Sequence, residues 1–443
     1  MLHLINNMTN KSIRRKIITG ASVGLVAAVG AKFLLQNGRL IMSKNIEEMK
    51  EEYSMLQNVK LRREKIGSEA LIIKNANFKN GMSGIVCENT KFIGCYFYPD
   101  VSIEIISMND VTFDGCQFMS CNFGGGVWNN VTFNKSDGRA KFFLLGGMGS
   151  KNVVFNECDF MGVPENEKII HENYFGMVGT HGHAAFFNCN LKYVGLEGDD
   201  GLSIKSSRLE KVYSNIQSGK CDLLLDDVVS KDYFDLTSSK FNKVEMRKTT
   251  FEDLRMVNVE TNALMMGECT AKMIGHGLKS VDATIRDCTF HDEGDPGNPV
   301  ERRYSGFSTY YGKIDHLSID NVRFGGSNGS LFIGGSINIY HDPKSLKPSK
   351  PIFYAEYGKI SIKKTSLKRA SLAYVHAEEV NISECDISDA NFDHSKFDIL
   401  TLRQVALAGK IDFTNTIVKR VTQENVRRDS KLSLIKTGAI IDI

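Results

Sequence analysis

The 443-residue sequence lacks the short motifs by which several classes of enzyme and metalloprotein are recognised. It contains no phosphate-binding loop of the GxxxxGK[ST] type, no HExxH motif and no CxxC pair. P-loop nucleotide chemistry, zinc-protease chemistry and a CxxC-type zinc site therefore have no support. No nucleophile–base arrangement stands out, so we predict no catalytic residue, no metal ligand and no cofactor-binding residue, and we expect that the protein is not an enzyme.

Proline and tryptophan are scarce, with seven residues and one residue, beside 39 glycines and 26 phenylalanines. Because phenylalanine is favoured in strands and glycine in tight turns, this balance favours β structure. A hydrophobic fraction of 42% and a charged fraction of 24% exclude wholesale disorder.

Outside the N-terminal region, positive and negative charges nearly balance. Residues 1–70 carry 12 Lys/Arg and 6 Asp/Glu, whereas the other 373 residues carry 43 basic and 46 acidic side chains. These 373 residues are therefore close to neutral. They have neither the basic surface of a nucleic-acid binder nor the dense acidity of a DNA mimic. We expect no nucleic-acid partner and no small-molecule substrate.

Residues 1–41 are a basic and apolar segment. Four basic residues between positions 11 and 16 precede an apolar run over 17–35, which only Lys32 interrupts. The run fits a secretory signal peptide or a short membrane anchor, and an extension upstream of a gene that starts at Met42 is the alternative. We expect a secreted, host-delivered or membrane-associated protein, or a cytoplasmic one if residues 1–41 are such an extension.

Residues 42–70 are predicted to form an N-terminal capping helix over 43–65. Ser43 can cap its start, and the helix is expected to end before Gly67. Apolar residues then recur at three- and four-residue steps, which is typical of one helix face. They are Ile46, Met49, Tyr53, Leu56 and Val59.

Large apolar residues recur every five positions along much of the chain. Neither a helix nor a single strand places every fifth side chain on one face over such a distance. The clearest run has ten members: Ile362, Leu367, Leu372, Ala377, Ile382, Ile387, Phe392, Phe397, Leu402 and Leu407. Two shorter runs are Phe113, Phe118, Phe123, Trp128 and Phe133, and Leu236, Phe241, Met246, Phe251 and Met256.

A small residue lies two positions before many of these large ones, as in Cys121-Asn122-Phe123 and Ala390-Asn391-Phe392. We interpret the pattern as a square coil, in which each five-residue side sends one large and one small residue inwards and its polar pair outwards. Four such sides make a coil of about 20 residues.

The 20-residue period is visible independently, in a block of the form apolar-x-apolar-x4-apolar. Most steps between successive blocks are 18–22 residues, and longer steps indicate insertions near 161–183, 291–313 and 325–358. The middle residues of the blocks are Ile73, Phe92, Phe113, Phe133, Phe155, Phe186, Ile204, Leu224, Met246, Met266, Ile285, Ile319, Ile362, Ile382 and Leu402.

The five-residue repeat resembles the pentapeptide-repeat family over residues 71–420, most closely in the ten-member run. The resemblance implies an all-β, right-handed quadrilateral parallel β-helix, here of about 13 coils. Such solenoids need caps, so we expect the helix within 42–70 and the residues 421–443 to close the two ends.

Ten cysteines raise the question of disulfides. Cys95 and Cys116 lie one coil apart, close enough for a disulfide, but we expect buried free thiols that act as small hydrophobic residues. Seven cysteines occupy the small inward position: Cys95, Cys116, Cys121, Cys158, Cys189, Cys288 and Cys385.

Two clusters contain residue types that bind metal ions. One lies in the first insertion, and the other, His291-Asp292-Glu293-Gly294-Asp295, opens the second. Neither has the spacing of a known site, and we interpret both as solvated polar loops. The first cluster consists of Glu165, Glu167, His171, Glu172, His181 and His183.

The β-helix also resembles that of enterobacterial type III secreted effectors of the PipB kind and of the SopA and NleL kind. The SopA and NleL kind carry in addition a C-terminal catalytic lobe with a cysteine nucleophile. Here the last cysteine, Cys385, lies inside the repeat, and residues 421–443 are too few for a lobe. The resemblance implies a non-enzymatic protein-binding scaffold, a secreted bacterial virulence effector that engages a host protein or, through residues 17–35, a membrane.

Two other functions stay open. Gly198-Asp199-Asp200-Gly201 and Gly275-His276-Gly277 are similar to elements of β-helical polysaccharide hydrolases and lyases, but nearly four coils, about 15–20 Å, separate them. That separation is too large for one carboxylate-based site. The second alternative is a DNA-mimicking, topoisomerase-protecting pentapeptide protein, which would need one continuously acidic face.

Overall fold

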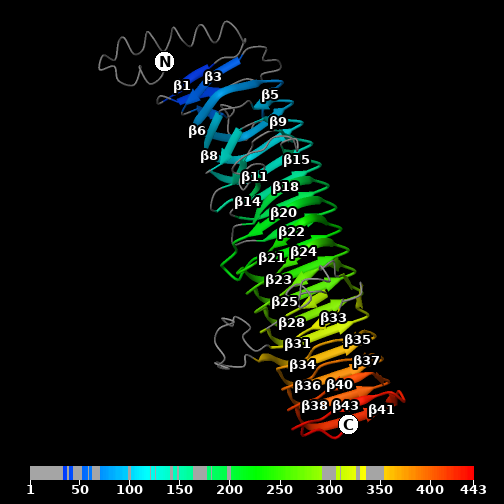
Figure 1. Ribbon diagram of the computed structural model, residues 1–443. Coiled ribbons are helices and arrows are strands. Elements are labelled where there is room, and N and C mark those ends of the chain that lie inside the picture. The colour runs from blue at the N-terminus through cyan, green and yellow to red at the C-terminus, as the bar shows by residue number, and fades with distance from the viewer. Residues whose placement is uncertain are drawn as a thin grey trace, which may run out of the picture. The chain divides into compact units, whose positions relative to one another are not determined.

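The described part of the chain is a parallel β-solenoid of about 13 turns, as Figure 1 shows. It is all-β, and no helix occurs among the residues described in this computed structural model. By its internal contacts the chain divides into two compact units, residues 1–200 with 206–209, and residues 201–205 with 210–443. The described residues are 33–36, 39–42, 52–57, 59–61, 70–97, 101–119, 121–124, 126–139, 143–146, 149–162, 177–180, 182–196, 201–291, 306–309, 311–325, 330–335 and 354–443.

In the first unit, parallel strands pair turn upon turn in three series. The first series is β5 (Leu71–Lys74), β6 (Asn77–Ile93), β8 (Val101–Asp114), β11 (Val127–Asn134), β14 (Lys151–Asn156) and β17 (Ala184–Phe187). The second is β7 (Tyr96–Phe97), β9 (Gln117–Met119), β12 (Asp137–Arg139), β15 (Asp159–Gly162) and β18 (Asn190–Leu196). β8 continues into a third series with β10 (Cys121–Gly124), β13 (Phe143–Gly146) and β16 (Met177–Thr180).

The core of the first unit is a stack of phenylalanine rings, one from each turn. Phe113 stacks on Phe133 with ring centroids 4.8 Å apart, and Phe133 stacks on Phe155 at 4.7 Å. Phe155 stacks in turn on Phe186 at 4.7 Å. These spacings match the distance between hydrogen-bonded strands, so the register that pairs the backbones also stacks the rings.

The second unit continues the same kind of stacking, with one long strand in each turn. The long strands are β19 (Leu202–Lys205), β21 (Asp222–Asp226), β23 (Lys240–Arg247), β25 (Glu260–Gly267), β28 (Lys279–Arg286), β31 (Lys313–Asp320), β34 (Ala355–Lys363), β36 (Val375–Ser383), β38 (Lys396–Arg403) and β41 (Ile417–Glu424). β20 (Arg208–Ser214) has residues in both units.

Other strands form the remaining sides of these turns, and most of them are shorter. They are β22 (Val229–Asp235), β24 (Thr250–Arg255), β26 (Thr270–Ala271), β27 (Met273–Ile274), β29 (Thr289–Phe290), β30 (Gly306–Ser308), β32 (Arg323–Phe324), β33 (Ser330–Phe332), β35 (Ser366–Lys368), β37 (Asp386–Ser388), β39 (Ala406–Ala408), β40 (Lys410–Asp412), β42 (Arg427–Arg428) and β43 (Ser433–Ile435). Of these, β22 and β24 are longer than β19 and β21.

The five-residue pattern correctly predicts which residues are buried. Every member of the ten-residue run is at most 7% exposed, and so is every member of the run from Leu236 to Met256. The 20-residue period also pairs residues correctly, with one error. Leu225, not Leu224, follows Ile204 and precedes Met246 in the buried series, and Leu224 is 39% exposed.

Tight corners between the strands depend on residues in the left-handed conformation. Asn and Asp are the commonest among them, because their short polar side chains tolerate a positive φ best after glycine. Asp110, Asn130 and Asn152 occupy equivalent corners in successive turns and are joined by side-chain hydrogen bonds of 2.9 Å. The corners are therefore stacked and bonded like the strands.

The second half of the helix predicted over 43–65 contains strands instead. Residues 52–57 form β3 (Glu52–Gln57) and residues 59–61 form β4 (Val59–Leu61), and both pair in parallel with β6. An open sheet edge offers unpaired N–H and C=O groups, and strand pairing satisfies them where a helix would not. Residues 43–51 lie outside the described part. Upstream, β1 (Phe33–Gln36) and β2 (Arg39–Met42) form an antiparallel pair.

The three insertions are shorter than the sequence suggests. β16 lies within 161–183, β30 within 291–313 and β33 within 325–358, and each pairs with strands of neighbouring turns. The tail 421–443 likewise belongs to the solenoid, since β41, β42 and β43 pair with β38, β39 and β40.

Replacing Phe133 by alanine tests the ring stack. The ring is fully buried between two others, so we expect Phe133→Ala to lower the free energy of unfolding by about 3–5 kcal/mol. The neighbouring, partly exposed Thr132 is the control, and Thr132→Ala should change it by less than about 0.5 kcal/mol. Urea unfolding of both variants measures the difference, and equal losses would contradict the register.

Candidate binding surface

The cysteines form part of the buried interior. All nine whose side chains are described are free and buried, and the side chain of Cys121 lies outside that set. Burial raises the pKa of Cys385 to about 11. The thiols predicted from the five-residue pattern are thus placed correctly, but they do more than fill space.

At many corners the small inward residue donates a hydrogen bond to the backbone. The Cys385 thiol lies 3.0 Å from the carbonyl oxygen of Ser383, two residues earlier. Ser136 makes the equivalent bond to Asn134 at 3.0 Å, and Thr365 to Lys363 at 2.8 Å. Because Cys, Ser and Thr are interchangeable here, the position favours a small residue with a donor, which the apolar pattern alone does not reveal.

Buried thiols in this position should be inert in the folded protein. We expect Cys158 and Cys385 to react with a thiol reagent only after denaturant is added. A cysteine introduced at the exposed Thr422 is the matched control and should be labelled at once. Mass spectrometry of the native protein checks this, and rapid native labelling of Cys158 or Cys385 would contradict it.

The two clusters of metal-binding residue types fall largely outside the described residues. Of the first cluster only His183 is described, and of the second only His291. Among the residues that the structure describes, no group of three or more His, Cys, Asp or Glu could hold a metal ion.

The two elements that suggest a polysaccharide enzyme are not brought together in the described structure. Asp199 and Asp200 lie outside it, and His276 is placed at a corner beside Gly277, whose φ is +67°. Burial lowers the pKa of His276, which favours its neutral form. The Gly-His-Gly element is therefore a turn sequence here.

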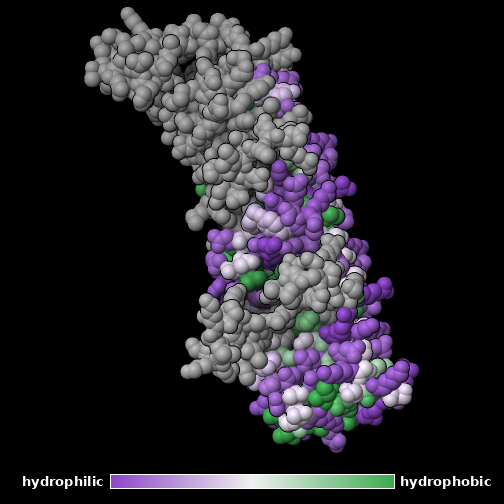
Figure 2. All heavy atoms as spheres, in the orientation of Figure 1, coloured by the Kyte–Doolittle hydropathy of each residue, from purple (hydrophilic) through white to green (hydrophobic). Residues whose placement is uncertain are grey.

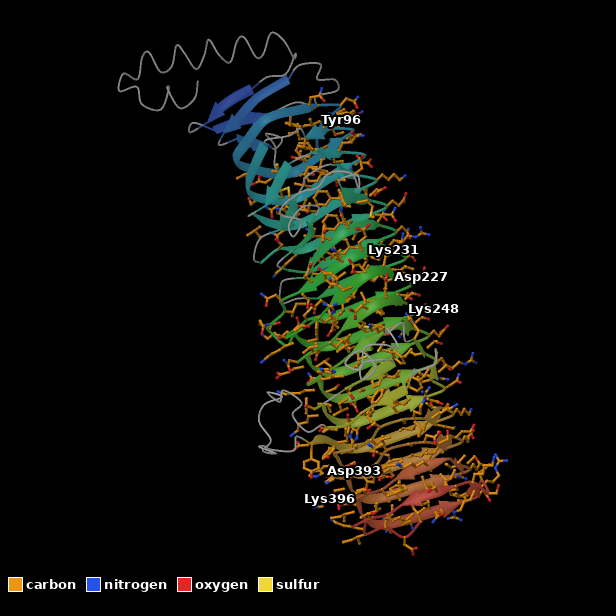
Figure 3. All side chains as sticks on the ribbon, in the orientation of Figure 1. Tyr96, Asp227, Lys231, Lys248, Asp393 and Lys396 are labelled. Atoms are coloured by element: carbon orange, nitrogen blue, oxygen red, sulfur yellow. The ribbon has the colours of Figure 1, made fainter. Side chains whose placement is uncertain are left out.

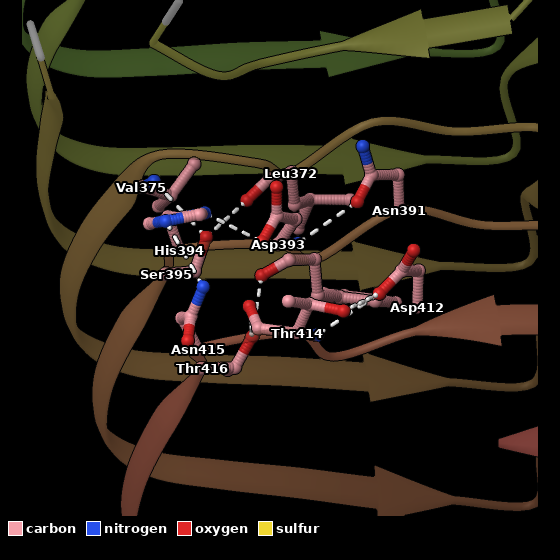
Figure 4. A network of polar contacts seen from close by, with 11 residues as sticks. Leu372, Val375, Asn391, Asp393, His394, Ser395, Asp412, Thr414, Asn415 and Thr416 are labelled. Carbon is pink, nitrogen blue, oxygen red and sulfur yellow. Dashed lines mark hydrogen bonds and ion pairs between the residues drawn. The ribbon is translucent and has the colours of Figure 1, made fainter. Parts of the chain in front are cut away.

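A Ser/His/Asp grouping at one corner has the composition of a catalytic triad but not its geometry (Figure 4). His394 Nδ1 lies 2.5 Å from Asp393 Oδ1, and Asn415 Nδ2 donates to His394 Nε2 at 3.1 Å. Since an amide nitrogen can only donate, Nε2 accepts and cannot activate a hydroxyl. Ser395 is buried and donates instead to the Leu372 carbonyl at 2.6 Å. These side chains hold the corner.

A G-x-S-x-G spacing at Gly325-Gly326-Ser327-Asn328-Gly329 was missed by the sequence analysis. In hydrolases this motif forms a nucleophile elbow between a strand and a helix. Here β32 precedes it and β33 follows it, and residues 326–329 lie outside the described part. The strand on either side is not the setting of an elbow, so the spacing does not support a hydrolase.

The outer face of the long strands in the second unit carries three parallel rows of side chains. We call the middle row the central column. In successive turns it consists of Leu224, Glu245, Met265, Thr284, Ser318, Ser361, Asn381, Thr401 and Thr422. From Thr284 onwards its members are small and uncharged. The two rows beside it hold most of the charges of this face.

Both flanking rows mix positive and negative side chains. One contains Lys359 and Glu379, whose charged groups lie 3.3 Å apart, and the other contains Arg403 and Glu424 at 3.1 Å. Pairs this exposed contribute little to stability, about 0–1 kcal/mol, but they fix the direction of long side chains. The face is thus not continuously acidic, as a DNA mimic requires.

The N-terminal end of the central column has a different character. Leu224 and Met265 are each 39% exposed, one turn on either side of Glu245. The Glu245 side chain is only 10% exposed, and Lys243 Nζ lies 2.6 Å from it, with Arg247 as its second partner. The two cationic partners stay more exposed, Lys243 at 39% and Arg247 at 62%. The end of the column therefore places two exposed apolar side chains beside charged groups that another protein could contact.

Other large apolar side chains are also exposed, among them Val281 at 44% and Ile440 at 65%. On the face that Figure 2 shows, the described surface is mainly hydrophilic, with hydrophobic atoms gathered towards the C-terminal end. In Figure 3 the side chains of Asp227, Lys231 and Lys248 project outwards from the stacked strands. Neither the central column nor its apolar end was predicted, because outward residues follow no period in the sequence.

Comparison of the chain with known protein families, curated proteins and solved structures finds no match. None of the described elements is a helix of sufficient length and apolarity to span a membrane. Most of the apolar run over 17–35 lies outside the described residues, so its prediction as a signal or anchor stays open.

The ion pairs lower the pKa of Glu245, chiefly through its hydrogen bond with Lys243. A depressed carboxyl pKa stabilises the fold above the ordinary value of 4.5, and this stabilisation is lost as the pH falls through the lowered pKa. We expect Glu245→Gln to lower the free energy of unfolding by about 1 kcal/mol at pH 7. The loss should become smaller as the pH falls below 4.5, so the wild-type chain and the variant are compared at pH 7 and pH 2. Denaturant unfolding at both pH values measures this, and a pH-independent loss would contradict it.

Proposed function

We propose that the protein is a non-enzymatic scaffold that binds another protein through the outer face of its second unit. The observation that supports this most directly is the exposed pair Leu224 and Met265 around the Glu245 ion pair. A partner that covers the two apolar side chains would gain affinity, and charges complementary to Lys243, Glu245 and Arg247 would add specificity. The small side chains beyond Thr284 would let a partner approach the sheet closely.

We also propose the finer assignment that the five-residue repeat suggests. In it the turns are right-handed and four-sided, as in the pentapeptide-repeat family, and the residues upstream of the first strands close the N-terminal end. The burial of every fifth residue supports a four-sided turn, because one inward residue from each side then meets at the axis.

The biological setting that we propose is a bacterial secreted effector that engages a host protein. The supporting argument is the resemblance of the repeat to type III effectors, together with residues 1–41, whose basic and apolar composition suits export or membrane attachment. The mixed charge of both flanking rows disfavours a topoisomerase-protecting DNA mimic. No arrangement among the described residues favours the polysaccharide enzyme.

Substitution of the two apolar residues tests the proposed binding face. We expect L224E/M265E to abolish capture of a host protein that the wild-type chain captures and to weaken its binding, once the partner is purified, at least tenfold. V229E/V281E is the matched control, since both valines are similarly exposed, at 38% and 44%, and lie outside the central column.

Photo-cross-linking in host-cell lysate identifies the captured protein. The dissociation constants of the wild-type chain and both variants are then measured with the purified partner. Equal capture by both variants and the wild-type chain would contradict the assignment of the face. Failure of any protein to bind the wild-type chain at micromolar concentration would contradict the scaffold function itself.

A further inference from the structure

Six of the nine cysteines with described side chains lie in pairs, one turn apart. Both members of a pair occupy the small inward position at equivalent corners of successive turns. The register shows this, because the residue after one cysteine pairs with the residue after the other. The pairs are Cys95 and Cys116, Cys158 and Cys189, and Cys269 and Cys288.

The backbone is hydrogen-bonded in the same way at each pair. The Cys95 carbonyl oxygen accepts a bond of 2.9 Å from the amide of Gln117, the residue after Cys116. The carbonyl oxygens of Cys158 and Cys269 accept the equivalent bonds at 2.9 and 2.8 Å. Stacked strands are about 4.8 Å apart, which lies within the range of roughly 4.4–6.8 Å between the Cα atoms of a disulfide. The backbone of each pair is therefore spaced for a disulfide.

The two sulfur atoms of a pair also lie near each other. The Cys269 amide donates to Cys288 Sγ at 3.4 Å, so this sulfur lies against the backbone of its partner. A hydrogen bond from the partner thiol lowers the pKa of Cys95, of Cys189 and of Cys269. Burial instead raises the pKa of the unpaired Cys385. One thiol of each pair therefore loses its proton more readily, and the thiolate is the form that attacks a disulfide.

Within the row of described inward residues, each of these thiols has one thiol neighbour. Ser136 separates the first pair from the second. Its hydroxyl oxygen accepts from the Cys116 amide at 3.2 Å, and its carbonyl oxygen accepts from the Asp159 amide at 3.0 Å. Thr249 and Val322 occupy the equivalent positions before and after the third pair. Six cysteines could pair in many ways, and the stacked turns select one of them.

We propose that the three pairs form disulfides between successive turns when the chain folds in the presence of a small disulfide oxidant. One thiolate attacks a sulfur atom of the oxidant and releases one small thiol. The second cysteine then attacks the mixed disulfide and releases another small thiol, so the oxidant takes up the two electrons and two protons that the pair loses. Where small thiols keep the chain reduced, the pairs stay free.

The reaction has to precede the closing of the turns, because all six side chains are at most 1% exposed in the folded chain. It therefore depends on the compartment in which the chain folds. The inference concerns the interior and does not rest on the proposed binding face.

Refolding in an oxidising mixture tests the proposal. The reduced chain is unfolded in urea, diluted into reduced and oxidised glutathione and alkylated, and its peptides are identified by mass spectrometry without reduction. We expect three pairs of linked peptides, one for each proposed disulfide, and alkylated Cys87, Cys221 and Cys385. The circular dichroism should match that of the chain refolded with a reductant.

Cys116→Ser is the matched variant, because Ser136 occupies the equivalent position one turn later. It should leave Cys95 alkylated and the other two disulfides intact, whereas Cys385→Ser should leave all three. If Cys116→Ser does not fold, Cys288→Thr replaces it, since Thr249 occupies an equivalent position. Its partner in the third pair should then be alkylated.

Alkylation of the six paired cysteines in the refolded chain, or disulfides that join other cysteines, would overturn the proposal. So would a disulfide between Cys95 and another cysteine in the Cys116→Ser variant. An oxidised chain whose circular dichroism differs from that of the reduced chain would also overturn it, because the proposed disulfides must fit the stacked turns.

Discussion

The structure depends on one constraint: each turn buries its inward side chains against one another and against the turns directly before and after it. The Phe113, Phe133 and Phe155 rings stack at the spacing of the paired backbones, so a shift of register would break the hydrogen bonds and the ring contacts together. In a solenoid of this kind stability is a sum over neighbouring turns. Every position in the turn therefore repeats as a straight row along the stack.

Rows that repeat in the sequence could be predicted, and the others could not. The inward residues were found because burial demands an apolar side chain at the same place in every turn. Leu224 was confused with Leu225 because they lie in a run of three leucines, where only the register separates the outward from the inward side chain. Outward positions need not carry the same kind of side chain in every turn. The position of Met265 beside Glu245 therefore follows only from the register of the strands.

The remaining errors have physical reasons as well. Tyr53 and Leu56 are spaced as on a helix, but β3 pairs with β6, and the backbone bonds of the sheet outweigh a weak local preference. β16, β30 and β33 are only three or four residues long, too short to show a five-residue period. The hydrogen-bonding role of Cys385 and its equivalents was missed because an apolar pattern treats cysteine as a small filler.

The outer surface follows from the same stacking. Once the interior fixes the register, small residues such as Ser361 and Thr401 fall into one row, and charged residues fall into the rows beside it. The binding face that we propose is thus a consequence of the stacked interior.

The most direct test of this account measures whether the outer rows are straight. Thr401→Cys and Thr422→Cys lie in adjacent turns of the central column, about 4.8 Å apart, and can be labelled with pyrene maleimide while the native thiols stay buried. The account predicts strong excimer fluorescence for this pair and weak excimer fluorescence for Thr401→Cys with Arg427→Cys, which lies on another strand. Equal emission from both pairs, or none from the first, would contradict the stacking.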